Sequence, residues 1–290
     1  MNNLTIKQLS KTYPNGVKAL QDINLTISNG MFGLLGANGA GKSSLMRTIA
    51  TLQTPTAGDI IFNGQSILED PVCIRQFLGY LPQEFGVYPK ISTEKLLDHI
   101  AVLKGIVSSK DRKEQINALL ERTNLYQHRK KAVHTFSGGM RQRFGIAQAL
   151  LGQPKIMIVD EPTAGLDPQE RNRFLNLLSE IGEQVIVILS THIVEDVLGL
   201  CTDMAILANG QIIKTGAPAR MVAELEGQIY TKTLTKEDTH TPFAEKVLSS
   251  RLVAGQTQIR VKANQLPEGG FEKANPNLED VYFEATQNLN

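Results

Sequence analysis

The sequence lacks long apolar runs and a cysteine framework, and each absence excludes a class of protein. The longest apolar runs, Lys155 to Val159 and Gln184 to Leu189, are as long as a strand, far below the ~20 residues of a membrane helix. The two cysteines, Cys73 and Cys201, stand far apart without Cys-x-x-Cys or Cys/His spacing. We therefore expect reduced structural thiols in a cytosolic protein, and neither a disulfide framework nor a cysteine metal site.

Excess charge and targeting signals are also missing. The 30 Lys and Arg residues nearly balance 29 Asp and Glu, for a formal net charge of +1, whereas a dedicated nucleic-acid binder usually carries a basic surplus. Residues Met1 to Thr5 show no basic stretch followed by an apolar one, so no targeting segment is expected. We expect no nucleic-acid partner. If the protein acts at a membrane, we expect it to bind there through a partner protein.

What is present is ample core material in an alternating pattern. The chain has 290 residues, 41% of them hydrophobic, which suits one large domain with or without a small one. Buried strands alternate with helices, which implies a mainly parallel sheet and hence an α/β fold. The predicted strands are 4–9, 23–27, 31–35, 59–62, 155–159, 185–189, 204–207, 211–214 and 256–261, and helices are predicted to begin near Lys42 and Pro168.

Residues 89–151 keep helical spacing and show no strand pattern. Ser92 can cap a helix there, and Asp111 followed by Glu114 resembles a capping box. We interpret this stretch as an inserted helical subdomain.

The composition changes again after about Glu226, where polar and turn-forming residues predominate. We therefore expect a main domain over residues 1–225, with its helical subdomain at about 86–151. A small C-terminal α/β domain is expected over 226–290.

A glycine-rich loop is the most specific motif of the chain. It matches the P-loop pattern G-x-x-x-x-G-K-S and reads Gly36-Ala37-Asn38-Gly39-Ala40-Gly41-Lys42-Ser43. Glycines let the backbone curl so that its N–H groups face phosphates, and the following helix adds its positive end. Lys42 supplies a cation for the outer phosphates, and the Ser43 hydroxyl can hold Mg²⁺. This loop alone does not separate transporters from kinases, GTPases or helicases.

Two carboxylates, Asp160 and Glu161, end the apolar strand that begins at Ile156. A buried parallel strand delivers them to the carboxyl edge of the sheet, where ligands bind in such folds. Asp160 can fix the hydration shell of Mg²⁺, and Glu161 can take the proton from an attacking water.

A second phosphate-binding helix end is indicated by Ser137, Gly138 and Gly139, which precede a helix. One chain thus carries two such loops, separated by the helical stretch. A head-to-tail homodimer would place each ATP between the P-loop of one chain and the Ser137 loop of the other.

The ordered motifs resemble the ATP-binding subunits of ABC transporters. The resemblance covers roughly residues 4–225 and implies a P-loop NTPase fold, with a RecA-like parallel core, an antiparallel β subdomain and the inserted helical subdomain. It implies ATP and Mg²⁺ as cofactors, a membrane permease and a second ATP-binding subunit as partners, and a cytoplasmic place at the inner face of the cell membrane. The residues that carry it are Tyr13, Gly36 to Ser44, Gln83, Ser137-Gly138-Gly139, Asp160-Glu161, Gly165-Leu166-Asp167 and His192.

The resemblance also implies roles for single residues. Tyr13 would stack on adenine, Ser44 would bind the nucleotide with the P-loop, and Gln83 would contact Mg²⁺. Asp167 would cross the dimer interface. His192 would act with Glu161 in catalysis by contacting the γ-phosphate.

Two positions depart from the family pattern, and the second of them bears on the dimer contacts. The usual Leu-Ser-Gly-Gly-Gln has Phe136 and Met140 at its outer positions here. Met140 replaces the glutamine and cannot make that side chain's hydrogen bonds, whereas Ser137 and both glycines are retained.

The stretch Gly165-Leu166-Asp167-Pro168 and the C-terminal stretch Leu278 to Tyr282 resemble the branch that exports drugs, lipids or ions through a separate permease. For the role of this tail, a small dimer-stabilising appendage and a regulatory element are equally open interpretations. Two alternatives from other classes remain: a soluble ABC ATPase acting on ribosomes or DNA, and a regulatory subunit with weak turnover. Near-neutral charge argues against the first, and the intact Asp160, Glu161 and His192 argue against the second.

Overall fold

The computed structural model describes residues 1–83, 85–86, 88–163, 166–234 and 246–287. The Cys73 side chain, expected to be a reduced thiol, and Gly165 of the Gly165-Leu166-Asp167 motif lie outside this described part. Within it, no helix is long and apolar enough to cross a bilayer.

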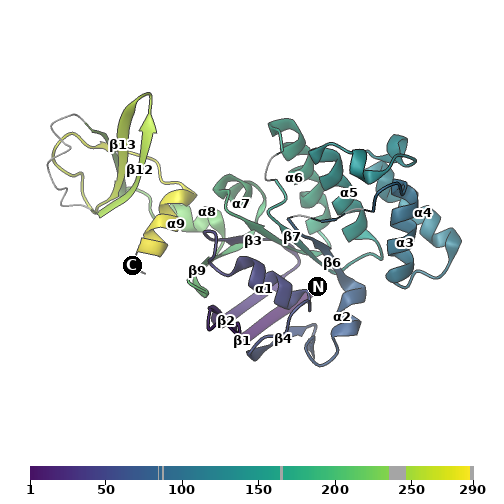
Figure 1. Ribbon diagram of the computed structural model, residues 1–290. Helices are drawn as coiled ribbons and strands as arrows, with labels where there is room; N and C mark the ends of the chain where they lie inside the picture. Colours follow the sequence, from purple (N-terminus) through teal and green to yellow (C-terminus); the bar gives the residue numbers. More distant parts are fainter. Residues whose placement is uncertain (84, 87, 164–165, 235–245, 288–290) are drawn as a thin grey trace.

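A six-stranded sheet in the order β10-β9-β3-β8-β7-β6 crosses the centre of the molecule (Figure 1). Its strands run parallel from β9 to β6, and β10 pairs antiparallel with β9. Every residue of β7 and β8 is buried, as expected for parallel strands covered on both faces. The strands are β3 (Gly30–Leu35), β6 (Leu78–Leu81), β7 (Ile156–Asp160), β8 (Ile186–Thr191), β9 (Asp203–Ala208) and β10 (Gln211–Gly216).

A second, antiparallel sheet in the order β2-β1-β4-β5 lies on one side of the central sheet. Its strands alternate buried and exposed residues, because one face packs on a core shared with α1 and β3 and the other meets water. The elements here are β1 (Asn3–Thr12), β2 (Lys18–Ser28), α1 (Lys42–Ile49), β4 (Ala57–Phe62), β5 (Gln65–Ser66) and α2 (Pro71–Phe77).

Helices cover the other side of the central sheet (Figure 1). Helices α5, α6 and α7 share one hydrophobic core with that sheet and with α3 and α4, which lie at the end of the molecule away from the C-terminus. The bounds are α3 (Thr93–Leu103), α4 (Ser109–Arg122), α5 (Gly138–Leu150), α6 (Pro168–Gly182) and α7 (Val194–Leu200), with short 3₁₀ turns at Tyr126–His128 and Val133–Thr135. The expected α/β class, with helices inserted before β7, is confirmed.

One helix start differs from the sequence prediction, and a second is capped without the expected side-chain bond. Helix α4 is capped by Ser108, whose hydroxyl accepts from the Asp111 N–H at 3.3 Å, so the predicted capping box at Asp111 is wrong. Ser92 does occupy the N-cap of α3, but its buried hydroxyl has no partner. The neighbouring Thr93 hydroxyl instead donates to the Lys131 carbonyl at 2.8 Å.

A third sheet, in the order β12-β13-β11-β14, is formed near the C-terminus. Helix α9 follows it and packs on α7, α8, β9 and β10 as well as on β12, so it stands between this sheet and the rest of the molecule (Figure 1). The bounds are α8 (Pro218–Ala223), β11 (Ile229–Thr233), β12 (Lys246–Val253), β13 (Gln256–Lys262), β14 (Glu272–Lys273) and α9 (Leu278–Gln287).

A buried ion pair joins α9 to this third sheet. Arg260 of β13 donates to both carboxylate oxygens of Asp280, at 2.8 and 2.6 Å, and the Asp280 side chain is only 1% exposed. The same carboxylate accepts from the Asn277 N–H at 2.9 Å. A buried charge with every oxygen paired holds its partners in one geometry.

Replacing Asp280 by alanine is expected to lower the free energy of unfolding of this region by about 3–5 kcal/mol, because Arg260 would stay buried without a counter-charge. Hydrogen exchange of the β13 amides and the urea midpoint measure the effect. The exposed neighbour Glu279 provides the control, since Glu279→Ala should change both by little. Equal protection of β13 in the two variants would contradict the stabilising role of the pair.

Candidate functional site

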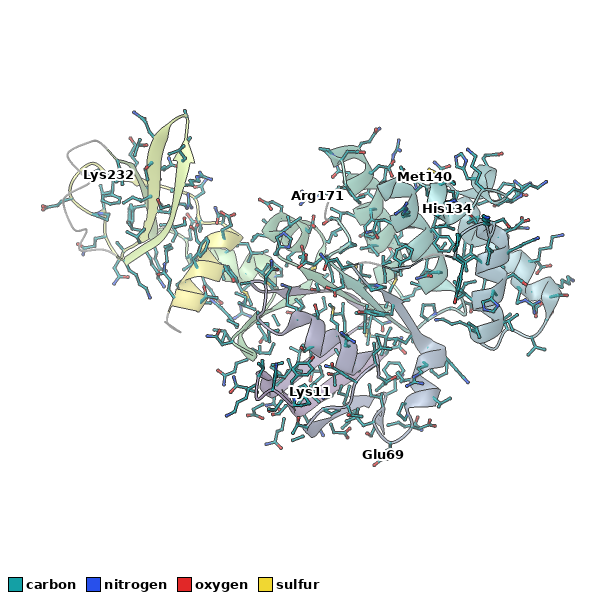
Figure 2. All side chains as sticks on the ribbon, in the orientation of Figure 1. Lys11, Glu69, His134, Met140, Arg171 and Lys232 are labelled. Atoms are coloured by element: carbon teal, nitrogen blue, oxygen red, sulfur yellow. The ribbon has the colours of Figure 1, made fainter. Side chains whose placement is uncertain are left out.

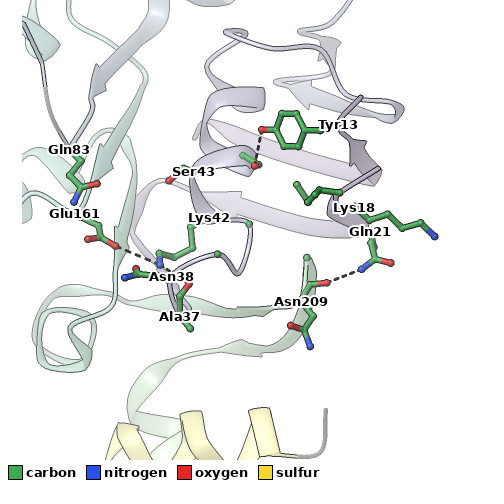
Figure 3. A pocket seen from close by; sticks show the side chains of 16 residues that line it. Tyr13, Lys18, Gln21, Ala37, Asn38, Lys42, Ser43, Gln83, Glu161 and Asn209 are labelled. Atoms are coloured by element: carbon green, nitrogen blue, oxygen red, sulfur yellow. Dashed lines mark hydrogen bonds and ion pairs between the residues drawn. The ribbon is translucent and has the colours of Figure 1, made fainter. Parts of the chain in front are cut away.

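A cavity of about 710 Å³ opens beside the glycine-rich loop, between that loop and the start of β2 (Figure 3). The loop connects β3 to α1 at the carboxyl edge of the central sheet. Helix α1 has Gly41 as its N-cap, without a side-chain cap, so its first N–H groups are available to an anion. The predicted binding residues that line the cavity are Tyr13, Ala37, Asn38, Gly39, Gly41, Lys42, Ser43, Ser44 and Gln83.

Two glycines of the loop are required by space, and one of them, Gly41, is required by its backbone angle as well. Gly41 has φ 111°, and a Cβ there would lie 2.5 Å from the Ala19 carbonyl oxygen. A Cβ on Gly36 would lie 2.5 Å from the Leu207 carbonyl oxygen. Any side chain at either place would push the loop off the strands that support it.

The Lys42 ammonium lies at the centre of the site. It donates to the carbonyls of Gly36 at 2.7 Å and Ala37 at 3.2 Å, and it is 3.6 Å from Glu161 Oε1. Burial lowers the pKa of Lys42, while the nearby carboxylates of Glu161 and Asp160 act in the opposite sense. An anion entering the cavity therefore meets a partly desolvated cation.

The other Glu161 oxygen, Oε2, is 3.2 Å from Nδ1 of His192. The two residues come from neighbouring strands: Glu161 follows β7, His192 follows β8, and the Glu161 N–H donates to the Ser190 carbonyl at 2.9 Å. Glu161 itself has a positive φ of 45°, an uncommon backbone conformation that is often found at functional sites. The two predicted catalytic residues thus lie side by side.

Ser43 and Asp160 form an oxygen-rich corner under the loop. The Ser43 hydroxyl donates to Asp160 Oδ2 at 3.4 Å. Burial raises the pKa of the Asp160 carboxyl, and the charge of Glu161 adds to the rise. Hydroxyl, carboxylate and the nearby Gln83 amide are hard oxygen donors, which suit a cation that retains waters and phosphate oxygens. The described residues contain no cluster of three or more His, Cys, Asp or Glu able to enclose a metal alone.

Tyr13 closes the opposite side of the cavity from Gln83 and Glu161, with Lys42 between them (Figure 3). Its hydroxyl lies 3.1 Å from the Ser44 hydroxyl and donates to Gln53 Oε1 at 3.1 Å. These contacts hold the ring at the rim of the cavity, where a planar base can stack on it.

The sequence did not indicate the residues that support the loop from the side. The turn Asn209-Gly210 was predicted only as a hairpin, yet the Gly210 N–H donates to the Ala40 carbonyl at 3.0 Å. Gln21 donates to the carbonyl oxygen of Asn209 at 2.8 Å, and Lys18 also lines the cavity. No sequence pattern indicates these residues, because they support the loop only through the packing of a turn that is distant from it in the sequence.

Ser137, Gly138 and Gly139 lie outside the cavity. Ser137 is exposed and caps α5, accepting from the Met140 N–H at 3.3 Å. Asp167 likewise caps α6 and accepts from the Glu170 N–H at 2.9 Å. Within one chain, neither cap faces the Lys42 site.

The central sheet, the loop from Gly36 to Ser43 and the paired carboxylates define a P-loop nucleoside triphosphatase. A family model described as ABC transporter matches residues 20–164. The chain belongs to this family, and it is an ATP-binding protein and ATPase of the ABC type.

The similar curated proteins have names that point to different transport functions. The chain is 31% identical to YxlF of Bacillus subtilis, an uncharacterized ABC transporter ATP-binding protein, over 97% of this chain and 98% of that one. It is 36% identical to the methionine import protein MetN of Protochlamydia amoebophila over 73% of this chain, and 28% identical to the probable multidrug protein YbhF of Escherichia coli over 97%. It spans only 66% of MetN and 51% of YbhF.

Solved structures share the fold. An ATP-binding subunit of an ABC transporter superposes with a TM-score of 0.68 at 29% identity, over 76% of this chain and 92% of that one. A dimeric bacterial ABC transporter cassette does so with a TM-score of 0.68 at 25% identity, over 74% and 98%.

Replacing Lys42 by alanine is expected to weaken ATP binding about 10- to 100-fold, because a hydrogen-bonding cation is lost from the site. Titration calorimetry with ATP measures the change. The exposed Lys7 on β1 supplies the control, since Lys7→Ala removes the same charge away from the cavity. Equal ATP affinity of the two variants would remove Lys42 from nucleotide binding.

Proposed function

We propose that the chain energises an exporter, by binding and hydrolysing ATP for a separate membrane permease. The observation that carries the ATP chemistry is the convergence of Lys42, Ser43 and Glu161 on one cavity, with Asp160 bonded to Ser43 directly behind it. The proposed ATPase domain spans residues 1–225, with its helical part at about 86–151, and 226–290 form an accessory domain.

The nucleotide is proposed to lie along the cavity from Tyr13 to Lys42. Its base stacks on Tyr13, and its phosphates bind Lys42 and the backbone N–H groups from Gly36 to Ser44. Mg²⁺ is held by Ser43, Asp160 and Gln83, and when bound it offsets the charge of the phosphates.

The hydrolytic step is assigned to Glu161 and His192. Glu161 accepts the proton of the attacking water as general base. His192 contacts the γ-phosphate, and its 3.2 Å contact with Glu161 supports a place beside the reacting atoms.

Each complete site is proposed to require two chains. Ser137 and Gly138 are exposed, and together with Gly139 they lie outside the cavity of their own chain. The helix N-terminus that they form suits the γ-phosphate bound by a partner. Asp167 at the start of α6 is placed across the same homodimer interface. The dimeric cassette of similar fold supports this arrangement.

A membrane permease is the proposed partner of the helical part. An apolar hollow of about 450 Å³ lies near the start of α3, lined by Tyr88, Ile91, Lys95, Leu96 and His99. Tyr88 is 62% exposed, and exposed apolar surface of this kind marks protein contacts. Docking there would hold the chain at the cytoplasmic face of the cell membrane. No nucleic-acid partner is proposed.

Export is favoured over import by the extent of two similarities. The probable multidrug protein YbhF aligns with 97% of this chain, which includes most of residues 226–290, whereas the MetN of Protochlamydia amoebophila aligns with 73%. The tail segment Leu278 to Tyr282, which begins α9, resembles exporters, as does the stretch Gly165 to Pro168.

Replacing Glu161 by glutamine is expected to lower kcat for ATP hydrolysis about 100-fold or more, because glutamine cannot accept the proton. ATP should still bind and drive formation of a stable dimer, seen by size-exclusion chromatography. Phosphate release gives the rate. Near-normal turnover would remove Glu161 from the role of general base.

The shared site can be tested by mixing two inactive variants. Lys42→Ala disables the P-loop of one chain, and Ser137→Arg blocks the loop of the other, so a mixed dimer retains one intact site. Random pairing makes half of the dimers mixed, which predicts that about a quarter of the wild-type ATPase activity returns if the sites are equivalent. Activity that stays at the level of the separate variants would contradict the two-chain site.

A further inference from the structure

The first turn of α6 carries two adjacent charged side chains that reach different helices. Glu170 accepts from Arg143 of α5, with Nη1 2.6 Å from Oε2. Arg171 donates to Asp196 of α7 through Nε at 2.9 Å and Nη2 at 2.7 Å. Consecutive helical residues point about 100° apart, so one turn touches both neighbours. We call these four residues the α6 charge chain.

At the α7 end, the chain reaches the hydrolytic residues. The Asp196 side chain is fully buried, and it also accepts from the Thr163 hydroxyl at 2.7 Å. Thr163 stands two residues after Glu161, and the intervening Pro162 has a fixed φ. Asp196 therefore ties the helix that follows His192 to the segment that follows Glu161.

At the α5 end, the charge chain reaches the Ser137 loop. Arg143 lies in the helix that Ser137 caps, and Gly139 packs directly on Glu170, because a Cβ on Gly139 would lie 2.8 Å from Glu170 Oε2. Figure 2 shows Arg171 and Met140, the residue after Gly139, on the same side of the central sheet.

We propose that Glu170 and Arg171 are positioning residues that couple the two ATP sites of the dimer. The inference rests on the proposed shared site, in which the Ser137 loop of a chain contacts the partner's nucleotide while Glu161 and His192 serve its own. When the partner's nucleotide draws the Ser137 loop, the charge chain carries that displacement to Asp196. Charged hydrogen bonds are costly to lengthen, above all those to the fully buried Asp196 carboxylate, so the helices move together rather than apart.

The test is steady-state ATP hydrolysis by the full chain carrying Arg143→Gln, Asp196→Asn or both. The two residues share no partner among the contacts that the structure describes. Each single change is expected to lower kcat about tenfold while ATP affinity of the isolated chain stays within about twofold. The double variant is expected to be no slower than the slower single variant, because both changes interrupt one connection.

Arg173 provides the matched control. It also bonds Glu170, at 3.0 Å, but it is 55% exposed and lies on α6 itself. Arg173→Gln should leave kcat and ATP affinity unchanged. If Asp196→Asn does not fold, Arg171→Gln replaces it, since this side chain is 30% exposed.

Losses in kcat that multiply in the double variant would overturn the coupling, as would single variants with normal kcat. A loss of kcat accompanied by an equal loss of ATP affinity would assign the residues a structural role instead and also overturn it. The two-chain site is tested separately by the mixing of Lys42→Ala with Ser137→Arg. If mixing restores activity but the losses in kcat multiply in the Arg143→Gln/Asp196→Asn double variant, the coupling is rejected and the two-chain site stands.

Discussion

The pairing of β3, β8 and β7 at their carboxyl ends is the constraint on which the site depends. Leu35 lies opposite Thr191, and Asp160 lies opposite Ser190. This register brings three separate segments of the chain to one edge: the loop after β3, Glu161 after β7 and His192 after β8. A shift of one residue in any pair would turn these side chains toward the opposite face.

Much of this edge could be predicted from the sequence because its signals are local. The glycines and Lys42 of the loop, the apolar strand before Asp160, and the helix start at Asp167-Pro168 each follow from a few neighbouring residues. Contacts between distant segments could not be predicted. The support of the loop by Gly210 and the bond between Arg171 and Asp196 depend on how the elements pack, which no short pattern encodes.

The missed elements have a similar physical reason. Strand β6, Leu78–Leu81, follows α2 without a turn signal, and its Gly79 packs against the Ala149 carbonyl. Strand β12, Lys246–Val253, buries only Leu248 fully, so its pattern hardly differs from that of a loop. In such strands the partner strand decides the conformation more than the residues themselves do.

The bonds between Lys42 and the carbonyls of Gly36 and Ala37 affect how the loop receives its ligand. Because the ammonium bonds two carbonyls of the curl, it holds the loop in shape from within, and a loop held in this way loses little backbone entropy on binding phosphate. Phosphate binding instead replaces the hydrogen bonds between Lys42 and the two carbonyls by bonds between Lys42 and phosphate oxygens. Affinity at this site is therefore the difference between two well-ordered arrangements, and it depends on how loosely the loop holds its own lysine.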